Sequence, residues 1–170
     1  MLCEETDLVD FLDLGLQPMS GIFPGKDEPD PVSAPLTLRR CSNPKCSNVQ
    51  LSAAHNLENM AKHYSYYSGI SPMMENHLKT IASEIESYNS LNEGDNLLDI
   101  GCNDCTLLNQ FAERGFNLYG MDPSASKFQH RFSSEIKVHF DFFSKVSLYS
   151  WLGKEIKFKS IFIPSLCSMI

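Results

Sequence analysis

An acid, a glycine and a second acid at a defined spacing are the residues of this chain best suited to hold a ligand. Asp99 lies in the apolar run 97–100, Gly101 ends that run, and a helix-like apolar stretch follows. A strand that ends in glycine and leads into a helix brings backbone N–H groups toward a ligand in the turn. Asp122 follows Gly101 at the distance of about 20 residues at which dinucleotide-binding folds place the acid that binds ribose hydroxyls. The spacing therefore predicts a cofactor that carries a ribose.

The sequence of the turn argues against one class of cofactor. It reads GCNDC over residues 101–105 and does not match the GxGxxG string, so a pyrophosphate-binding NAD site, and with it an NAD-dependent oxidoreductase, is disfavoured. Asn103 lies inside the turn and is a further candidate for contact with the cofactor. Cys105 stands where another glycine would fit, and a β-carbon there costs energy if the backbone needs a positive φ.

Alternating apolar segments are expected to position these residues in an α/β fold. Proline and glycine are dense in the first 50 residues, which predicts short strands and turns with little core. A helix is predicted over 71–88, with Ser71 as N-cap, Pro72 in the first turn and a stripe of Met74, His77, Leu78, Ile81 and Ile85, and a shorter helix is predicted over 57–69. Strands over 96–101, 117–123, 137–143 and 159–165 then alternate with helices over 105–115, 124–134 and 147–156, a pattern typical of a parallel sheet with crossover helices.

Composition excludes several function classes. The formal net charge is -7 and no basic patch is present, which argues against a nucleic-acid partner. There is no apolar run long enough to span a membrane, and the acidic N-terminus does not resemble a signal peptide. We therefore expect a cytoplasmic protein, in which the six cysteines are thiols or metal ligands rather than disulfides.

Three ordered strings carry a resemblance to a known family. LDLGLQPMSGIF (12–23), HYSYYSGISPMMENHLKTIA (63–82) and LLDIGCNDCTLL (97–108) resemble strings of the nucleotide-sugar C-methyltransferases. That resemblance implies a zinc-binding-type domain over 1–54, a helical linker over 55–93, and a partial S-adenosylmethionine-dependent methyltransferase domain over 94–170. The implied fold is an incomplete Rossmann-like class I methyltransferase sheet, and the implied substrate is a nucleotide-linked keto-deoxysugar.

The resemblance also implies roles for single residues. Asp99 and Gly101 would lie at the methionine moiety of S-adenosylmethionine, Asp122 at its ribose and Asp141 at its adenine amino group. In the YSYYSG string, Tyr67 and Ser68, with Tyr64, would belong to a loop that closes over the site of methyl transfer. Taken alone, such a tyrosine-rich turn is more often a packing corner.

The N-terminal domain of that family is implied to hold zinc through four cysteines. This chain supplies Cys3, Cys41 and Cys46, while a tetrahedral structural zinc site needs four Cys or His ligands. The fourth ligand would have to be His55, His63, another donor or a water. Three reduced thiols without metal are the alternative.

The chain also departs from the family. The implied catalytic base lies in a downstream histidine string that has no counterpart here, so no catalytic residue is assigned. The chain spans less than half of the family's usual length, from which we expect truncation at both ends, impaired or absent turnover, and a partner chain that completes the sheet. The alternative hypothesis is a non-catalytic remnant or interaction protein.

Overall fold

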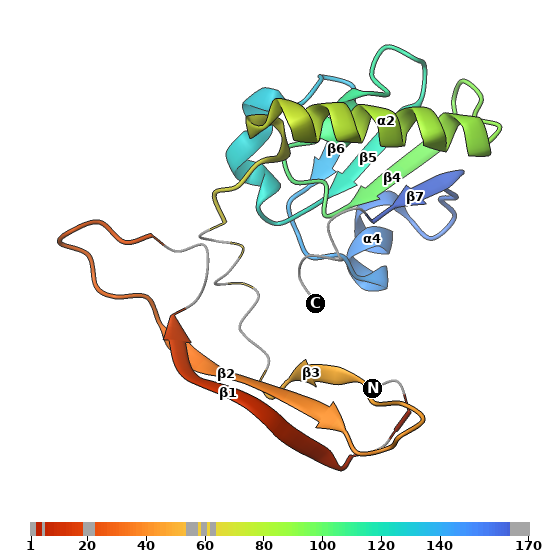
Figure 1. The fold of residues 1–170 in the computed structure, drawn as a ribbon. Helices are drawn as coiled ribbons and strands as arrows, with labels where there is room; N and C mark the ends of the chain where they lie inside the picture. Colours follow the sequence, from red (N-terminus) through yellow and green to blue (C-terminus); the bar gives the residue numbers. More distant parts are fainter. Residues whose placement is uncertain are drawn as a thin grey trace. The chain divides into compact units, whose positions relative to one another are not determined.

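A computed structural model of the chain describes residues 3–4, 6–18, 23–53, 58, 61 and 64–163. The chain divides into two compact units, Met1–Ser65 and Tyr66–Ile170 (Figure 1). Within the described residues, none of the helices has the length and apolarity that crossing a membrane requires. The predictions for His55, His63 and Cys167, and residues 57, 59, 60, 62 and 63 of the helix predicted over 57–69, lie outside the described residues. The prediction of a helix is wrong for residues 64–67, which are not helical and lead into a 3-10 turn, η1 (Ser68–Ile70).

The first unit is built on a three-stranded antiparallel sheet. Strands β1 (Leu8–Pro18), β2 (Ser33–Cys41) and β3 (Val49–Leu51) lie in the order β1-β2-β3. The first two strands are longer than the short strands predicted. The reason is that several prolines, Pro24, Pro29 and Pro31 among them, lie in the connection between β1 and β2 and do not interrupt the ladder.

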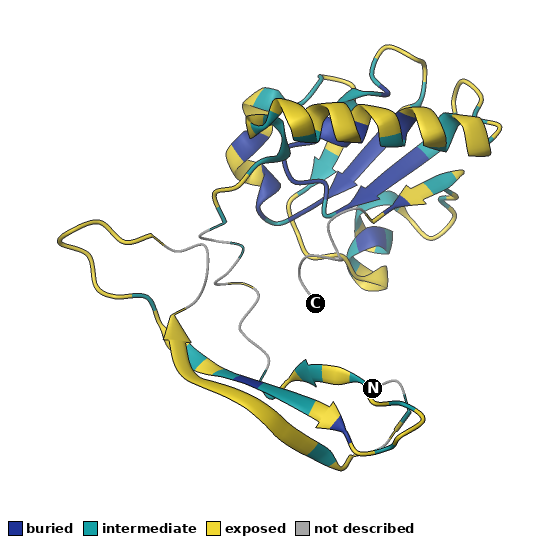
Figure 2. Cartoon of the chain, viewed as in Figure 1, coloured by how far each residue is buried: buried dark blue, intermediate teal, exposed yellow. Residues whose placement is uncertain are grey.

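This unit buries little of its surface. Among its described residues only Thr37 and Cys41 are buried, and the side chains of β1 are largely exposed (Figure 2). The prediction of a segment with little core of its own is confirmed for these residues.

The second unit contains a four-stranded parallel sheet. Its strands are β4 (Asn96–Ile100), β5 (Asn117–Met121), β6 (Ile136–His139) and β7 (Ser160–Phe162), in the order β6-β5-β4-β7. All three pairings are parallel. The predicted α/β class with a parallel sheet is confirmed, and the strand order is compatible with a Rossmann-like fold.

Helices cover both faces of this sheet, because alternate residues of a strand point to opposite faces. On one face Leu97 packs with Leu78 and Ala82 of α2 (Pro72–Tyr88). On the other face Leu98 packs with Leu148 of α4 (Lys145–Leu152). The predicted bounds of α2 are confirmed, and the helix, which the sequence placed in a linker, contributes to this core; His77 of its predicted apolar stripe is exposed.

Other elements are shorter or tighter than predicted. Helix α3 (Thr106–Asn109) continues as turns with i→i−3 hydrogen bonds and ends where Glu113 and Gly115 adopt positive φ. The helix predicted over 124–134 is a 3-10 helix, η2 (Ala125–Arg131). The third strand stops at His139 instead of reaching residue 143; beyond it the Phe142 amide donates to the Asp141 carboxylate and not to a neighbouring strand.

Candidate cofactor site and cysteine cluster

The turn that follows β4 has an unusual backbone. Gly101 (φ 80°), Asn103 (φ 49°) and Cys105 (φ 60°) all lie in the left-handed region. Such a conformation costs a residue other than glycine about 1 kcal/mol or more. The turn is held by hydrogen bonds from the Gly101 amide to the Met121 carbonyl and from the Cys105 amide to the Cys102 carbonyl, each 2.8 Å. The positive φ considered for position 105 is thus present, and the cysteine tolerates it.

Asp99 lies on β4 directly before this turn and is almost completely buried, with 1% of its surface exposed. Its Oδ1 atom has no hydrogen-bond partner among the described residues. Burial, and then the nearby charge of Asp122, raise the pKa of Asp99 to about 8. The carboxyl group is therefore mostly protonated at pH 7, and it is a buried polar group without a partner, which is the kind of feature that calls for a functional explanation.

Asp122 lies at the end of β5 beside the turn. Its Oδ2 accepts a hydrogen bond from the Asn103 amide at 3.0 Å. Its Oδ1 accepts from the amide and the hydroxyl of Ser124, at 2.7 and 2.6 Å. The structure therefore brings together the two acids and the glycine that the sequence singled out, at the carboxyl ends of two neighbouring parallel strands.

The YSYYSG segment packs against the same turn. The side-chain amide of Asn103 donates to the Tyr66 carbonyl, and its oxygen accepts from the Ser68 amide, both at 3.0 Å. The neighbouring 3-10 turn η1 (Ser68–Ile70) begins at Ser68. The Tyr67 ring lies against Phe128, with the ring centroids 5.6 Å apart. Tyr67 and Ser68 are thus adjacent to the turn. The side chain of Asn103, which was a candidate for contact with the cofactor, is already hydrogen-bonded to the backbone of Tyr66 and Ser68.

Two residues that the sequence reasoning missed fix this corner. Asp104 is fully buried and accepts hydrogen bonds from the Gly69 amide and from Nε of Arg131, both at 3.0 Å. The Arg131 guanidinium also lies over the Tyr67 ring, 4.6 Å from its centroid. A β-carbon on Gly69 would collide with Arg131 and come within 2.9 Å of Asp104. The glycine of YSYYSG was the available signal, since it marks a close approach of the backbone to other groups.

Asp141 lies after the end of β6 and is exposed. Its Oδ2 accepts a hydrogen bond from the Ser147 hydroxyl at 2.8 Å, and Ser147 Oγ lies 3.1 Å from Nε2 of His139. These bonds, from Ser147 first and the Phe142 amide second, lower the pKa of Asp141. The His139 ring stacks on Trp151. The backbone of His139 accepts from the Asp122 amide, so Asp141 follows the same edge of the sheet as Asp122.

The first unit brings its three cysteines together. The Sγ atoms of Cys3, Cys41 and Cys46 all lie within 4.8 Å of one another, and those of Cys3 and Cys41 are 3.6 Å apart. A tetrahedral zinc with Zn–S bonds of about 2.3 Å separates its sulfurs by about 3.8 Å, so this spacing fits a metal ion. Burial, followed by contacts with the other two thiols, raises the pKa of Cys41. The described residues offer no fourth Cys, His, Asp or Glu in the group.

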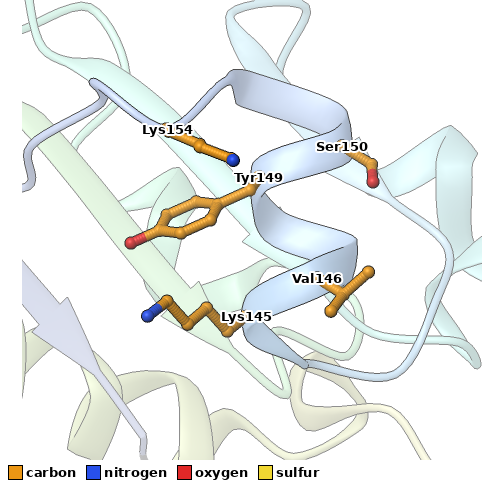
Figure 3. Close-up of a pocket in the computed structure, with 5 residues that line it drawn as sticks. All are labelled: Lys145, Val146, Tyr149, Ser150 and Lys154. Carbon is orange, nitrogen blue, oxygen red and sulfur yellow. The ribbon is translucent and has the colours of Figure 1, made fainter.

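A separate hollow of about 470 Å³ lies along α4 (Figure 3). It is lined by Lys145, Val146, Tyr149, Ser150 and Lys154, all from one short segment. The Lys145 ammonium lies 5.6 Å from the centroid of the Tyr149 ring. The hollow shares no residue with the turn after β4, and it does not bear on the cofactor prediction.

The described residues form an α/β protein. Its second unit has a four-stranded parallel sheet, and its first unit has a group of three cysteines able to bind a metal. Comparison with known proteins finds no matching protein-family model and no matching curated protein.

Proposed function

We propose that the second unit binds S-adenosylmethionine and that the chain is a methyltransferase-family protein resembling the sugar C-methyltransferases. The observation that carries the proposal is Asp99, a buried carboxyl group with an unpartnered oxygen at the end of a central parallel strand. A ligand that supplies a donor or a positive charge to this atom would remove the cost of leaving it without a partner.

The topology supports a ligand at this place. β4 lies between β5, which follows it in the chain, and β7, which is the fourth strand of the sheet. The order of strands reverses at β4, and in open α/β sheets ligands bind outside the carboxyl ends of the strands at such a reversal. Asp99 lies on β4, and Gly101 lies in the turn directly after it. Asp122 follows the end of β5.

The charges favour a cationic cofactor. S-adenosylmethionine carries a sulfonium and an ammonium group, and two carboxyl groups, Asp99 and Asp122, interact electrostatically at the turn. The pyrophosphate of a dinucleotide would instead bring two negative charges toward Asp122 and would disfavour the ionised form of Asp99. By this proposal Asp99 and Gly101 contact the methionine moiety and Asp122 the ribose, with Asp141 beyond β6 near the adenine.

Turnover makes further demands. Methylation of a carbon beside a sugar ketone needs a base for the α-proton and a group that stabilises the enolate. Of the described histidines, His139 is stacked on Trp151 and contacts Ser147, while His77 on α2 and His130 on η2 are exposed. We assign none of them as the base and propose that this chain binds the cofactor with impaired or absent turnover. A non-catalytic interaction protein is the alternative.

We further propose that the first unit binds zinc through Cys3, Cys41 and Cys46, with a fourth ligand from outside this group. A bound Zn²⁺ would stabilise the thiolates and hold β1 and β2 to the loop that carries Cys46. Because this unit has few buried side chains, such a site would supply much of its stability.

Calorimetric titration with S-adenosylhomocysteine tests the cofactor proposal. We expect saturable binding by the native chain, binding weakened at least tenfold by Asp99→Asn, and unchanged binding in Asp27→Asn, a control on the first unit. NAD⁺ serves as the competing ligand. Absence of heat at millimolar S-adenosylhomocysteine, or tighter binding of NAD⁺, would refute the proposal and leave the non-catalytic or the oxidoreductase hypothesis.

A further inference from the structure

The turn after β4 holds a pair of cysteines that the proposed function does not use. Cys102 and Cys105 are separated by two residues, and both are buried, with 4% and 0% of their surface exposed. The Cys105 amide donates to the Cys102 carbonyl at 2.8 Å, which closes a four-residue turn. The neighbouring Cys105 thiol, and then burial, raise the pKa of the Cys102 thiol.

This geometry is compatible with a covalent bond between the two sulfurs. The first and fourth Cα atoms of a β-turn lie less than about 7 Å apart. A disulfide needs Cα atoms about 4.4–6.8 Å apart, and the side chains must point toward one another. A Cys-x-x-Cys pair at the junction of a strand and a helix in a βαβ unit is also the arrangement found in dithiol redox proteins.

We propose that Cys102 and Cys105 form a reversible disulfide in the turn after β4. The oxidant is a low-molecular-weight disulfide. The thiolate of Cys105 attacks one of its sulfurs and releases one thiolate, and Cys102 then loses its proton and attacks the Cys105 sulfur, which releases the second. The two protons of the dithiol pass to the two released thiolates, so one small disulfide is reduced to two thiols as the protein dithiol is oxidised.

Burial sets the rate of this reaction. Neither thiol is accessible while the turn is closed, so exchange proceeds through local opening of the turn. Attack also requires the thiolate of Cys102, so the raised pKa of this group slows the second step at neutral pH. Oxidation is therefore expected over hours and to accelerate as the pH rises. The Asn103 and Asp104 contacts with residues 66–69 hold the turn closed.

Only one part of this proposal, the effect of a bound cofactor on the disulfide, rests on the proposed function. A cofactor bound over Gly101 and Asp122 would hold the turn closed and slow the oxidation. By thermodynamic reciprocity, if the disulfide form binds S-adenosylhomocysteine more weakly, the ligand disfavours the disulfide by the same factor.

The test is oxidation of the native chain with oxidised glutathione in the presence of a chelator, followed by alkylation in denaturant and tryptic digestion. The peptide over 80–114 contains Cys102 and Cys105 and no other cysteine. We expect this peptide to lose both alkylation sites, to carry no glutathione, and to regain both sites after reduction. The pair Cys3 and Cys41, with sulfurs 3.6 Å apart, serves as an internal control for the oxidant.

Two variants that lack the Cys105 thiol test whether the oxidation product needs both cysteines. Cys105→Gly removes the second thiol and fits the positive φ of this position, so a single glutathione adduct on Cys102 is expected in place of the disulfide. Cys105→Ser keeps the side-chain size and should behave in the same way. Two free thiols, or two glutathione adducts, in the native peptide at the most oxidising glutathione ratio overturn the proposal. A disulfide that forms equally fast with and without saturating S-adenosylhomocysteine leaves the redox site standing and refutes its link to the cofactor site.

Discussion

The buried carboxyl group of Asp99 predicts an unusual dependence of stability on pH. Its pKa in the folded chain is about 8, against an ordinary value of 3.8, mainly because burial disfavours the charged form. The folded state therefore holds this proton more tightly than the unfolded state. The stability that the proton confers is fully present below about pH 4 and is lost as the pH rises through the window between about 4 and 8.

The size of the effect follows from the two pKa values. A tenfold difference in proton affinity corresponds to about 1.4 kcal/mol. Between pH 5 and pH 8, Asp99 should lower the free energy of unfolding by about 4 kcal/mol, a large part of the stability of a small domain. Asp99→Asn removes the ionisation, so the variant should be more stable than the native chain by about 5 kcal/mol at pH 8, and this advantage should shrink to about 2 kcal/mol at pH 5.

Urea denaturation of both proteins at pH 5, 6, 7 and 8 measures this difference. A gap that widens with pH agrees with the reasoning. A variant that is destabilised equally at every pH would show that Asp99 is ionised and well partnered in the folded chain, and it would remove the observation on which the proposed function rests. The same experiment separates binding from folding, because a variant that is more stable at pH 8 cannot lose the cofactor through unfolding.

Four further predictions concern the same features. Affinity for S-adenosylhomocysteine, measured by calorimetry, should rise about fivefold from pH 7 to pH 8. The reason is that the ligand binds the ionised form of Asp99, and the ionised fraction grows as the pH approaches the pKa of about 8. An affinity that does not change with pH would contradict a direct contact between the ligand and Asp99. Asp104→Asn should lower the free energy of unfolding, measured by urea denaturation, by about 3 kcal/mol, because it breaks a buried ion pair with Arg131. Asp10→Asn, which breaks an exposed ion pair, should lower it by less than about 1 kcal/mol. Equal losses in the two variants would argue against a stabilising role for the buried pair. Gly69→Ala should lower stability by about 1–3 kcal/mol in the same assay, since its β-carbon collides with Arg131, and an unaffected melting curve would mean that the corner is loose. Metal analysis of chain purified without chelator should give close to one zinc per chain and far less in Cys41→Ser, and a native ratio near zero would remove the zinc proposal.

Several features could be predicted from local sequence alone. The apolar runs and the glycine and proline punctuation predicted the four parallel strands and the bounds of α2, because these signals depend on periodicity and capping. The spacing of Gly101 and Asp122 predicted a cofactor that carries a ribose, and this stays a prediction. The lengths of α3, η2 and β6 could not be predicted, since they depend on single side-chain or backbone contacts, such as the bond between the Phe142 amide and the Asp141 carboxylate beyond the third strand.

What the sequence determined by itself is the α/β class, the acids and glycine at the turn after β4, and the presence of three cysteines in the first unit. The contacts among these residues arise only when the chain folds. Cys3 and Cys41 are 38 residues apart in the chain, and their thiols meet beside the end of the β1–β2 ladder. Asp99 reads in the sequence as an ordinary acid, yet it becomes mostly neutral at pH 7 because the layers packed over β4 exclude water and Asp122 lies close by. Burial and charge proximity arise from contacts between distant segments, so local sequence patterns do not contain them.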